Sequence, residues 1–170
     1  MEPIEQMRND GAGKGLCRLY QLRLRDGLSV KDLSDLYKGG MKFCIDNDFP
    51  TLDFLREHYR GKCEEYGVYI DDAVAEELHN PDTVVMNGES VAFFRYNEYT
   101  VSQLYVRHTS KAAVVVGGNA IVTISLFDDA ELVISKATEA ASVHVKVYGR
   151  ATVRVLGRPI EIEYKHKNTI

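Results

Sequence analysis

A degenerate repeat of about ten residues in the C-terminal half constrains the fold of this chain more than any other feature. The repeat extends from Lys111 to Gly157 and reads KAAVVVGG, NAIVTISLFD, DAELVISKATE, AASVHVKVYG and RATVRVLG. Each unit begins with a short polar or small segment that includes alanine and continues with apolar residues at every second position. This alternation is typical of β-strands that bury one face. A fixed period predicts stacked strands that share a continuous core.

The alanines fall into one column when the units are aligned on their first residues. That column holds Ala112, Ala120, Ala130, Ala141 and Ala151, and the next two inward positions hold Val, Leu or Ile. A small residue at the same end of every strand favours a β-solenoid. The alternative is an antiparallel meander, whose strands also recur at intervals of about eight to twelve residues. The sequence leaves both architectures open.

Outward-facing positions of the repeat are apolar in the early units and polar in the later ones. The early positions hold Ala113, Val115, Ile121, Phe127 and Val133. A strand that is apolar on both faces is expected to be covered on both, and a repeat stack has open ends that need capping. We therefore predict that these five residues form an oligomer or packing interface. A homo-oligomer is expected, with a trimer favoured.

The N-terminal half is helical in pattern, which gives an α+β chain: a small helical domain followed by an all-β, solenoid-like repeat domain. Apolar stripes at helical spacing predict three helices, with Gly39-Gly40 interrupting the second. Asn87-Gly88 predicts a two-residue hairpin loop. The predicted divisions are a flexible tail (1–15), a helical head (16–82), a β-repeat domain (83–164) and a basic tail (165–170).

Composition narrows the class of protein. The chain has 170 residues, of which 45% are hydrophobic and 27% charged, as in folded globular proteins. A formal net charge of −4 argues against a nucleic-acid partner. No apolar run is long enough for a secretory signal or a membrane span, so no membrane partner is expected. Three cysteines without a CxxC spacing indicate reduced thiols, and we expect the chain in the cytoplasm of the producing cell, or in a virion.

Candidate partner-binding residues lie in two places. Arg18, Arg23 and Arg25 form a basic patch on the first predicted helix. Tyr105, Arg107 and His108 lie at the entry to the repeats. These three residues, together with Tyr96 and Tyr99, are candidates to line a ligand pocket between the helical head and the repeats.

Nothing in the sequence predicts a catalytic residue, a metal site or a cofactor. The GAGKG run near the N-terminus lacks the Ser or Thr and the preceding strand that a phosphate-binding loop needs. An acyltransferase of the hexapeptide type would combine a β-helix with a catalytic histidine, for which His144 is the candidate. Its rungs, however, repeat every six residues, whereas the period here is near ten.

The segment FCIDNDFP, the entry YVRHTS and the Ala-x-Val-x-Val repeats together resemble uncharacterised phage and prophage proteins of gut bacteria. The resemblance covers the chain from about Leu16 onward. It implies a phage-encoded structural part, such as a head fibre, decoration or connector protein, that self-associates and contacts other virion proteins. The alternatives are an intracellular binding protein that sequesters a host protein or a small ligand, and the acyltransferase.

Overall fold

The computed structural model describes residues 2–170 and divides them into two compact units. The first unit extends to Tyr66 and includes Thr169–Ile170, and the second is Gly67–Asn168. The first is helical and the second consists of parallel strands, which confirms the predicted α+β class with a β-repeat domain. The β unit begins before residue 83, where the sequence places the repeat domain, because residues 68–70 and 78–79 already pair as strands.

Short helices make up the first unit. In chain order they are α1 (Pro3–Gly13), α2 (Arg18–Arg23), α3 (Val30–Gly39), α4 (Met41–Asp46), α5 (Leu52–His58) and the 3₁₀ helix η1 (Glu64–Tyr66). A capping box fixes the start of α3, because Ser29 Oγ accepts from the N–H of Asp32 and the Asp32 carboxylate accepts from the N–H of Ser29. The predicted second helix is divided at Gly40 into α3 and α4.

Helix α1 occupies most of the segment that the sequence predicts as a flexible tail. Pro3 stands at its first position, where a missing N–H costs nothing, and Glu5 lies in its first turn. Gly11 is buried: a Cβ there would lie 2.9 Å from Leu16 Cδ2 and 3.0 Å from Phe49 Cζ. Gly11 is therefore needed for close packing of the helix.

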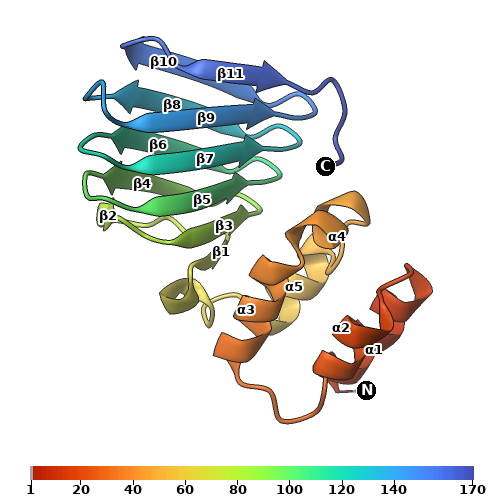
Figure 1. The fold of residues 1–170 in the computed structure, drawn as a ribbon. Coiled ribbons are helices and arrows are strands. Elements are labelled where there is room, and N and C mark those ends of the chain that lie inside the picture. The colour runs from red at the N-terminus through yellow and green to blue at the C-terminus, as the bar shows by residue number, and fades with distance from the viewer. Residues whose placement is uncertain (1) are drawn as a thin grey trace. The chain divides into compact units, whose positions relative to one another are not determined.

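The second unit is a β-solenoid of five coils (Figure 1). Its six-stranded sheet consists, in spatial order, of β1 (Val68–Ile70), β3 (Thr83–Asn87), β5 (Val101–Val106), β7 (Ile121–Leu126), β9 (Ser142–Val147) and β11 (Glu161–Tyr164). Its five-stranded sheet consists of β10 (Thr152–Gly157), β8 (Glu131–Lys136), β6 (Lys111–Val116), β4 (Val91–Tyr96) and β2 (Leu78–His79). The chain alternates between the sheets, so each strand pairs with the next but one.

All the strand pairings between these elements are parallel, which identifies the repeat as a solenoid and rules out the antiparallel meander. The predicted hairpin at Asn87-Gly88 is wrong. These residues join β3 to β4, which belong to different sheets, so the strong turn signal marks a corner of the coil. A two-residue hairpin loop joins antiparallel neighbours in one sheet, and β3 and β4 are not neighbours in a sheet.

The alanines of the repeat form two stacks at opposite corners, and not one column. Ala120 and Ala141 precede strands of the six-stranded sheet, whereas Ala130 and Ala151 precede strands of the five-stranded sheet. All four are buried. One coil contains two strands, so stacked residues are about twenty positions apart, twice the sequence period.

Ala112 does not belong to either stack. It is the second residue of β6 and lies beside Leu132 in the neighbouring strand. The corner position before β6 is held by Ser110, which is fully buried and donates from Oγ to the carbonyl of Gly88 at 3.0 Å. The alignment of the first unit was therefore two residues out of register, because a small polar residue can replace alanine at the corner.

Inward-facing side chains fill the space between the two sheets. Phe94 and Tyr96 are fully buried, and their rings stack with centroids 6.4 Å apart. Towards the C-terminal end the core becomes more exposed, as Val153 and Val155 of β10 are only partly buried. The basic tail is held at Lys167, whose carbonyl accepts the N–H of Gly149 at 2.9 Å.

Candidate interaction surfaces

The five residues predicted to form an interface lie on two faces and a corner of the solenoid. Ala113, Val115 and Val133 point outward from the five-stranded sheet, where they alternate with buried residues. Ile121 points outward from the six-stranded sheet. Phe127 is not outward-facing: it lies in the turn after β7 and is 1% exposed. One surface therefore holds three of the five.

A continuous apolar row crosses the five-stranded sheet on its outer side. The register places Phe93 beside Ala113 and Ala113 beside Val133, on three consecutive strands. Val133 remains 38% exposed and Val91, two residues before Phe93, 47% exposed. We call this surface the five-stranded face and define it by Val91, Phe93, Ala113, Val115 and Val133.

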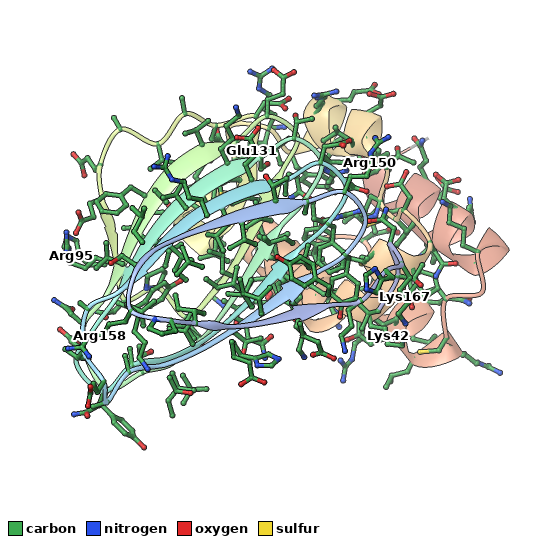
Figure 2. All side chains as sticks on the ribbon, turned by 90° about the horizontal axis from the view of Figure 1, so that it is seen from above. Lys42, Arg95, Glu131, Arg150, Arg158 and Lys167 are labelled. Atoms are coloured by element: carbon green, nitrogen blue, oxygen red, sulfur yellow. The ribbon has the colours of Figure 1, made fainter. Side chains whose placement is uncertain are left out.

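Charged side chains around the five-stranded face are largely paired within the chain. Lys111 Nζ lies 3.2 Å from Glu131 Oε1, and Arg95 pairs with Glu77. The hydrogen bond from Arg95 holds the pKa of Glu77 below its usual range. In Figure 2, which looks along the stack, Arg95 lies where the strands of this sheet end and Glu131 where they begin. The apolar row lies between Lys111 and Glu131 on one side, where Val91 is beside Lys111, and Arg95 on the other, where Val115 is beside Arg95.

The opposite face, on the six-stranded sheet, is mainly polar. Its outward positions include Gln103, Thr123 and His144, which occupy one row across β5, β7 and β9. His144 Nε2 lies 3.4 Å from Glu163 Oε2, and Nδ1 lies 3.9 Å from Glu161 Oε2. The histidine that the acyltransferase alternative requires thus contacts two carboxylates on an open sheet surface.

Stacked side chains fill the corner that follows the strands of the six-stranded sheet. The ring of Phe127 stacks on that of Tyr148, with centroids 4.6 Å apart and planes inclined by 16°. Arg107, one coil earlier, is 3% exposed, and its Nη1 donates to Asn87 Oδ1 at 3.4 Å. Arg107 was a candidate partner-binding residue, but its burial in this column gives it a structural role.

The neighbouring corner position builds a ladder of hydrogen bonds between coils. The N–H of Gly88 donates to His108 Nδ1 at 3.0 Å, and the N–H of His108 donates to Asp128 Oδ2 at 2.9 Å. Asp128 then donates its own N–H to Asn168 Oδ1 at 3.0 Å. Burial alone would raise the pKa of Asp128, but the hydrogen bonds from Asn168 and His108 and the positive charges nearby lower it overall. His108 is thus a structural residue of the corner.

The aromatic residues expected to line one pocket are separated. Tyr96 ends β4 and is fully buried in the core, whereas Tyr99 lies in the corner that follows and is 82% exposed. Tyr105 points outward from β5, where its hydroxyl donates to Gln103 Oε1 at 2.9 Å. These three side chains belong to two different sides of the coil, and so they do not surround one ligand.

The basic patch belongs to the helical unit. Arg18 and Arg23 are in α2, whereas Arg25, which the sequence places on the same helix, follows its end. Beside α2 is an apolar groove of about 440 Å³, whose lining includes Leu16, Tyr20, Leu24, Leu33, Leu36 and Phe43. Of the three cysteines, Cys17 is exposed and lines this groove, whereas the other two are buried.

Two features of these surfaces escape sequence reasoning. Phe93 was not assigned to the outward face, although the alternation in VAFFRY could have placed it there once that segment was aligned with the repeat. The groove has no sequence signal, because it forms from residues far apart in the chain.

Among residues 2–170, no three His, Cys, Asp or Glu side chains are arranged to hold a metal ion. No helix in the same range is long and apolar enough to cross a membrane.

Comparison of the chain with protein-family models, with curated proteins and with solved structures finds no match.

Proposed function

We propose that this chain is a non-enzymatic structural module that self-associates through its five-stranded face, and that it works as an assembled part of a bacteriophage particle. The observation that carries the proposal is the outward-facing apolar row in which Phe93 and Ala113 are half-buried and Val133 is exposed. Surfaces of this kind, bordered by polar residues, are typical of protein interfaces. The phage setting rests on the sequence resemblance, which implies a head fibre, decoration or connector protein.

The size of the face determines what kind of association it supports. Strands about 4.8 Å apart and about six residues long, at about 3.3 Å per residue, give a face of roughly 20 Å by 20 Å. Two such faces bury an area at the small end of specific interfaces, below about 1,200 Å² in total. The association is therefore expected to be reversible and concentration-dependent.

A single self-complementary face favours a two-fold dimer. In an isologous interface both copies use the same patch, whereas a trimer needs two different patches that fit each other. In residues 2–170, the row of Phe93, Ala113 and Val133 crosses three strands of the five-stranded sheet, whereas the comparable row of the six-stranded sheet, Val68, Val85 and Tyr105, is buried at its first two positions. The trimer expected from the sequence is the alternative outcome of a mass measurement.

The free edges of the last coil are less suited to the same role. Outward positions of β10 and β11 carry Arg154, Glu161 and Glu163. Charged side chains on an edge strand oppose the addition of a further strand. Growth of the stack by edge-to-edge pairing is therefore disfavoured relative to face-to-face packing.

Light scattering after size exclusion, on the purified full chain over a micromolar concentration series, tests the proposal. The weight-average mass should rise from that of one chain, 19.2 kDa, towards a multiple of it as the concentration increases. A mass that stays at one chain throughout would contradict self-association.

The phage setting has its own test. Antibodies to the chain should label particles released after prophage induction, and particles that lack the chain would contradict the phage setting.

A further inference from the structure

Helix α2 contributes no buried side chain to the helical unit. Leu19 and Leu22, three positions apart and therefore on one side of the helix, are 56% and 67% exposed. The flanking residues Leu16 and Leu24 are buried and anchor the segment at both ends. Single exposed leucines are common on protein surfaces. Two on the same helical face beside an apolar groove indicate a surface that a partner covers.

The groove next to α2 is extended. A second hollow of about 480 Å³ shares Tyr20, Leu36 and Gly39 with the first and continues to Leu22 and Arg25. Volumes of this size lie within the range of binding sites, about 300–1,000 Å³. The shared residues make the two hollows one groove along α3.

The glycine pair at the end of α3 shapes this groove. A Cβ on Gly39 would lie 3.3 Å from Tyr20 Oη, and one on Gly40 would lie 3.3 Å from Tyr20 Cε1. Side chains at these positions would crowd the Tyr20 ring, which lines both hollows. The two glycines therefore end α3 and also let an aromatic ring lie against the junction with α4.

The groove is lined by charges of both signs, but among residues 2–170 its arginines have no acidic partners. No carboxylate in the described part of the chain forms an ion pair with Arg18, Arg23 or Arg25. Of the acids that line the second hollow, Asp32 accepts hydrogen bonds from Ser29, and Asp35 pairs with Lys31 at 2.7 Å and with Lys38 at 3.3 Å. The Arg23 guanidinium lies over the Tyr20 ring, 5.6 Å from its centroid, but none of the three arginines has a carboxylate partner among the described residues. Their positive charge beside an apolar groove matches a ligand that is acidic on one side and apolar on the other.

We propose that the groove along α2 and α3 binds a short acidic amphipathic helix of a partner protein. The ten residues of α3 extend about 15 Å, the length of nearly three helical turns. Apolar residues of the partner at helical spacing would occupy the groove, and its Asp or Glu side chains would meet the arginines. This inference concerns the helical unit and is independent of the self-association proposed for the solenoid.

Calorimetric titration of the full chain with a synthetic peptide tests the idea. The probe is a capped twelve-residue peptide with Leu on one helical face and Glu on the other, and the comparison peptide has Lys in place of Glu. The Glu peptide should bind in the micromolar range and at least ten-fold more tightly than the Lys peptide, and its affinity should fall with added salt. Equal affinities, or no binding of the Glu peptide, would overturn the proposal.

Two further measurements locate the site. Arg25→Glu should weaken the Glu peptide about ten-fold, whereas Arg60→Glu, an equal charge change at an exposed arginine outside the groove, should leave the affinity unchanged. The Glu peptide should also slow alkylation of Cys17, since this thiol lines the groove. Equal effects of both variants, unchanged Cys17 alkylation, or binding of sodium oleate in the groove with no binding of the Glu peptide would each contradict a helix-binding groove.

Discussion

His108 donates its backbone N–H to the carboxylate of Asp128, one coil further along the solenoid, at 2.9 Å. Both residues have a left-handed backbone, with φ of 59° and 58°. This conformation costs about 1–2 kcal/mol for residues other than glycine. The hydrogen bonds between coils offset that cost, so the corner ladder is expected to contribute to stability and register.

Asp128→Ala should lower the free energy of unfolding by about 1–3 kcal/mol, because it leaves the N–H of His108 and the amide of Asn168 without their acceptor. Urea denaturation at neutral pH measures the change. Asp129→Ala is the matched control, since its ion pair with Arg150 is exposed and should contribute less than about 1 kcal/mol. Equal losses for the two variants would contradict the ladder.

The contribution of Asp128 should also depend on pH. Its folded-state pKa lies below the ordinary aspartate value of about 3.9. The ionised group therefore stabilises the fold fully above that ordinary value, and this stabilisation is lost as the pH falls through the lower folded-state pKa. The difference in unfolding free energy between wild type and Asp128→Ala should thus shrink in acid. A difference that stays constant down to strongly acidic pH would show that ionisation is not involved.

Gly118→Ala should destabilise the solenoid by about 3 kcal/mol or more, because φ is 55° and a Cβ would clash with the backbone carbonyl of Asn97. Gly157→Ala is the control: its φ is 76° but nothing lies within 4 Å, so only the conformational cost of about 1–2 kcal/mol applies. Thermal unfolding of both variants measures the difference. Similar shifts would show that the close approach to Asn97 is unimportant.

Tyr96→Phe should stabilise the protein by about 1 kcal/mol or leave its stability unchanged. The Tyr96 hydroxyl is buried and has no hydrogen-bond partner among the described residues, and burial raises its pKa. Removing a polar group that is buried without a partner is neutral or favourable. Chemical denaturation measures the change, and a loss of about 1 kcal/mol or more would mean that the hydroxyl has a partner such as a bound water.

The sequence predicts the class of fold because strand alternation survives in every unit of the repeat. It does not reveal that a coil contains two strands, since both sheets present the same alternation. For that reason the sequence predicts a hairpin at Asn87-Gly88. The alignment of Ala112 with Ala120 has a different cause, because Ser110 takes the place of alanine at its corner. Pairing between strands is a long-range property, and a ten-residue period is compatible with several pairings.

The interaction surfaces were predicted only in part, for a similar reason. Outward and inward positions follow from alternation, so Val133 and Ile121 were correctly placed on the outside. The sheet to which an outward residue belongs depends on how successive strands alternate between the two sheets of a coil. The burial of Phe127 depends on its contact with Tyr148, one coil away. The basic patch on α2 could be found from residue types, but the groove beside it depends on helix packing.

Val133 and Ile121 provide the most direct test of self-association through the five-stranded face. Both are β-branched, outward-facing and similarly exposed, at 38% and 40%, but they lie on opposite sheets. Sedimentation equilibrium of Val133→Lys and Ile121→Lys, with circular dichroism to confirm folding, compares the two faces. We expect Val133→Lys to weaken association at least ten-fold, about 1.4 kcal/mol, and Ile121→Lys to associate as wild type does. Loss of association in Ile121→Lys alone, or equal behaviour of both variants, would contradict the central claim.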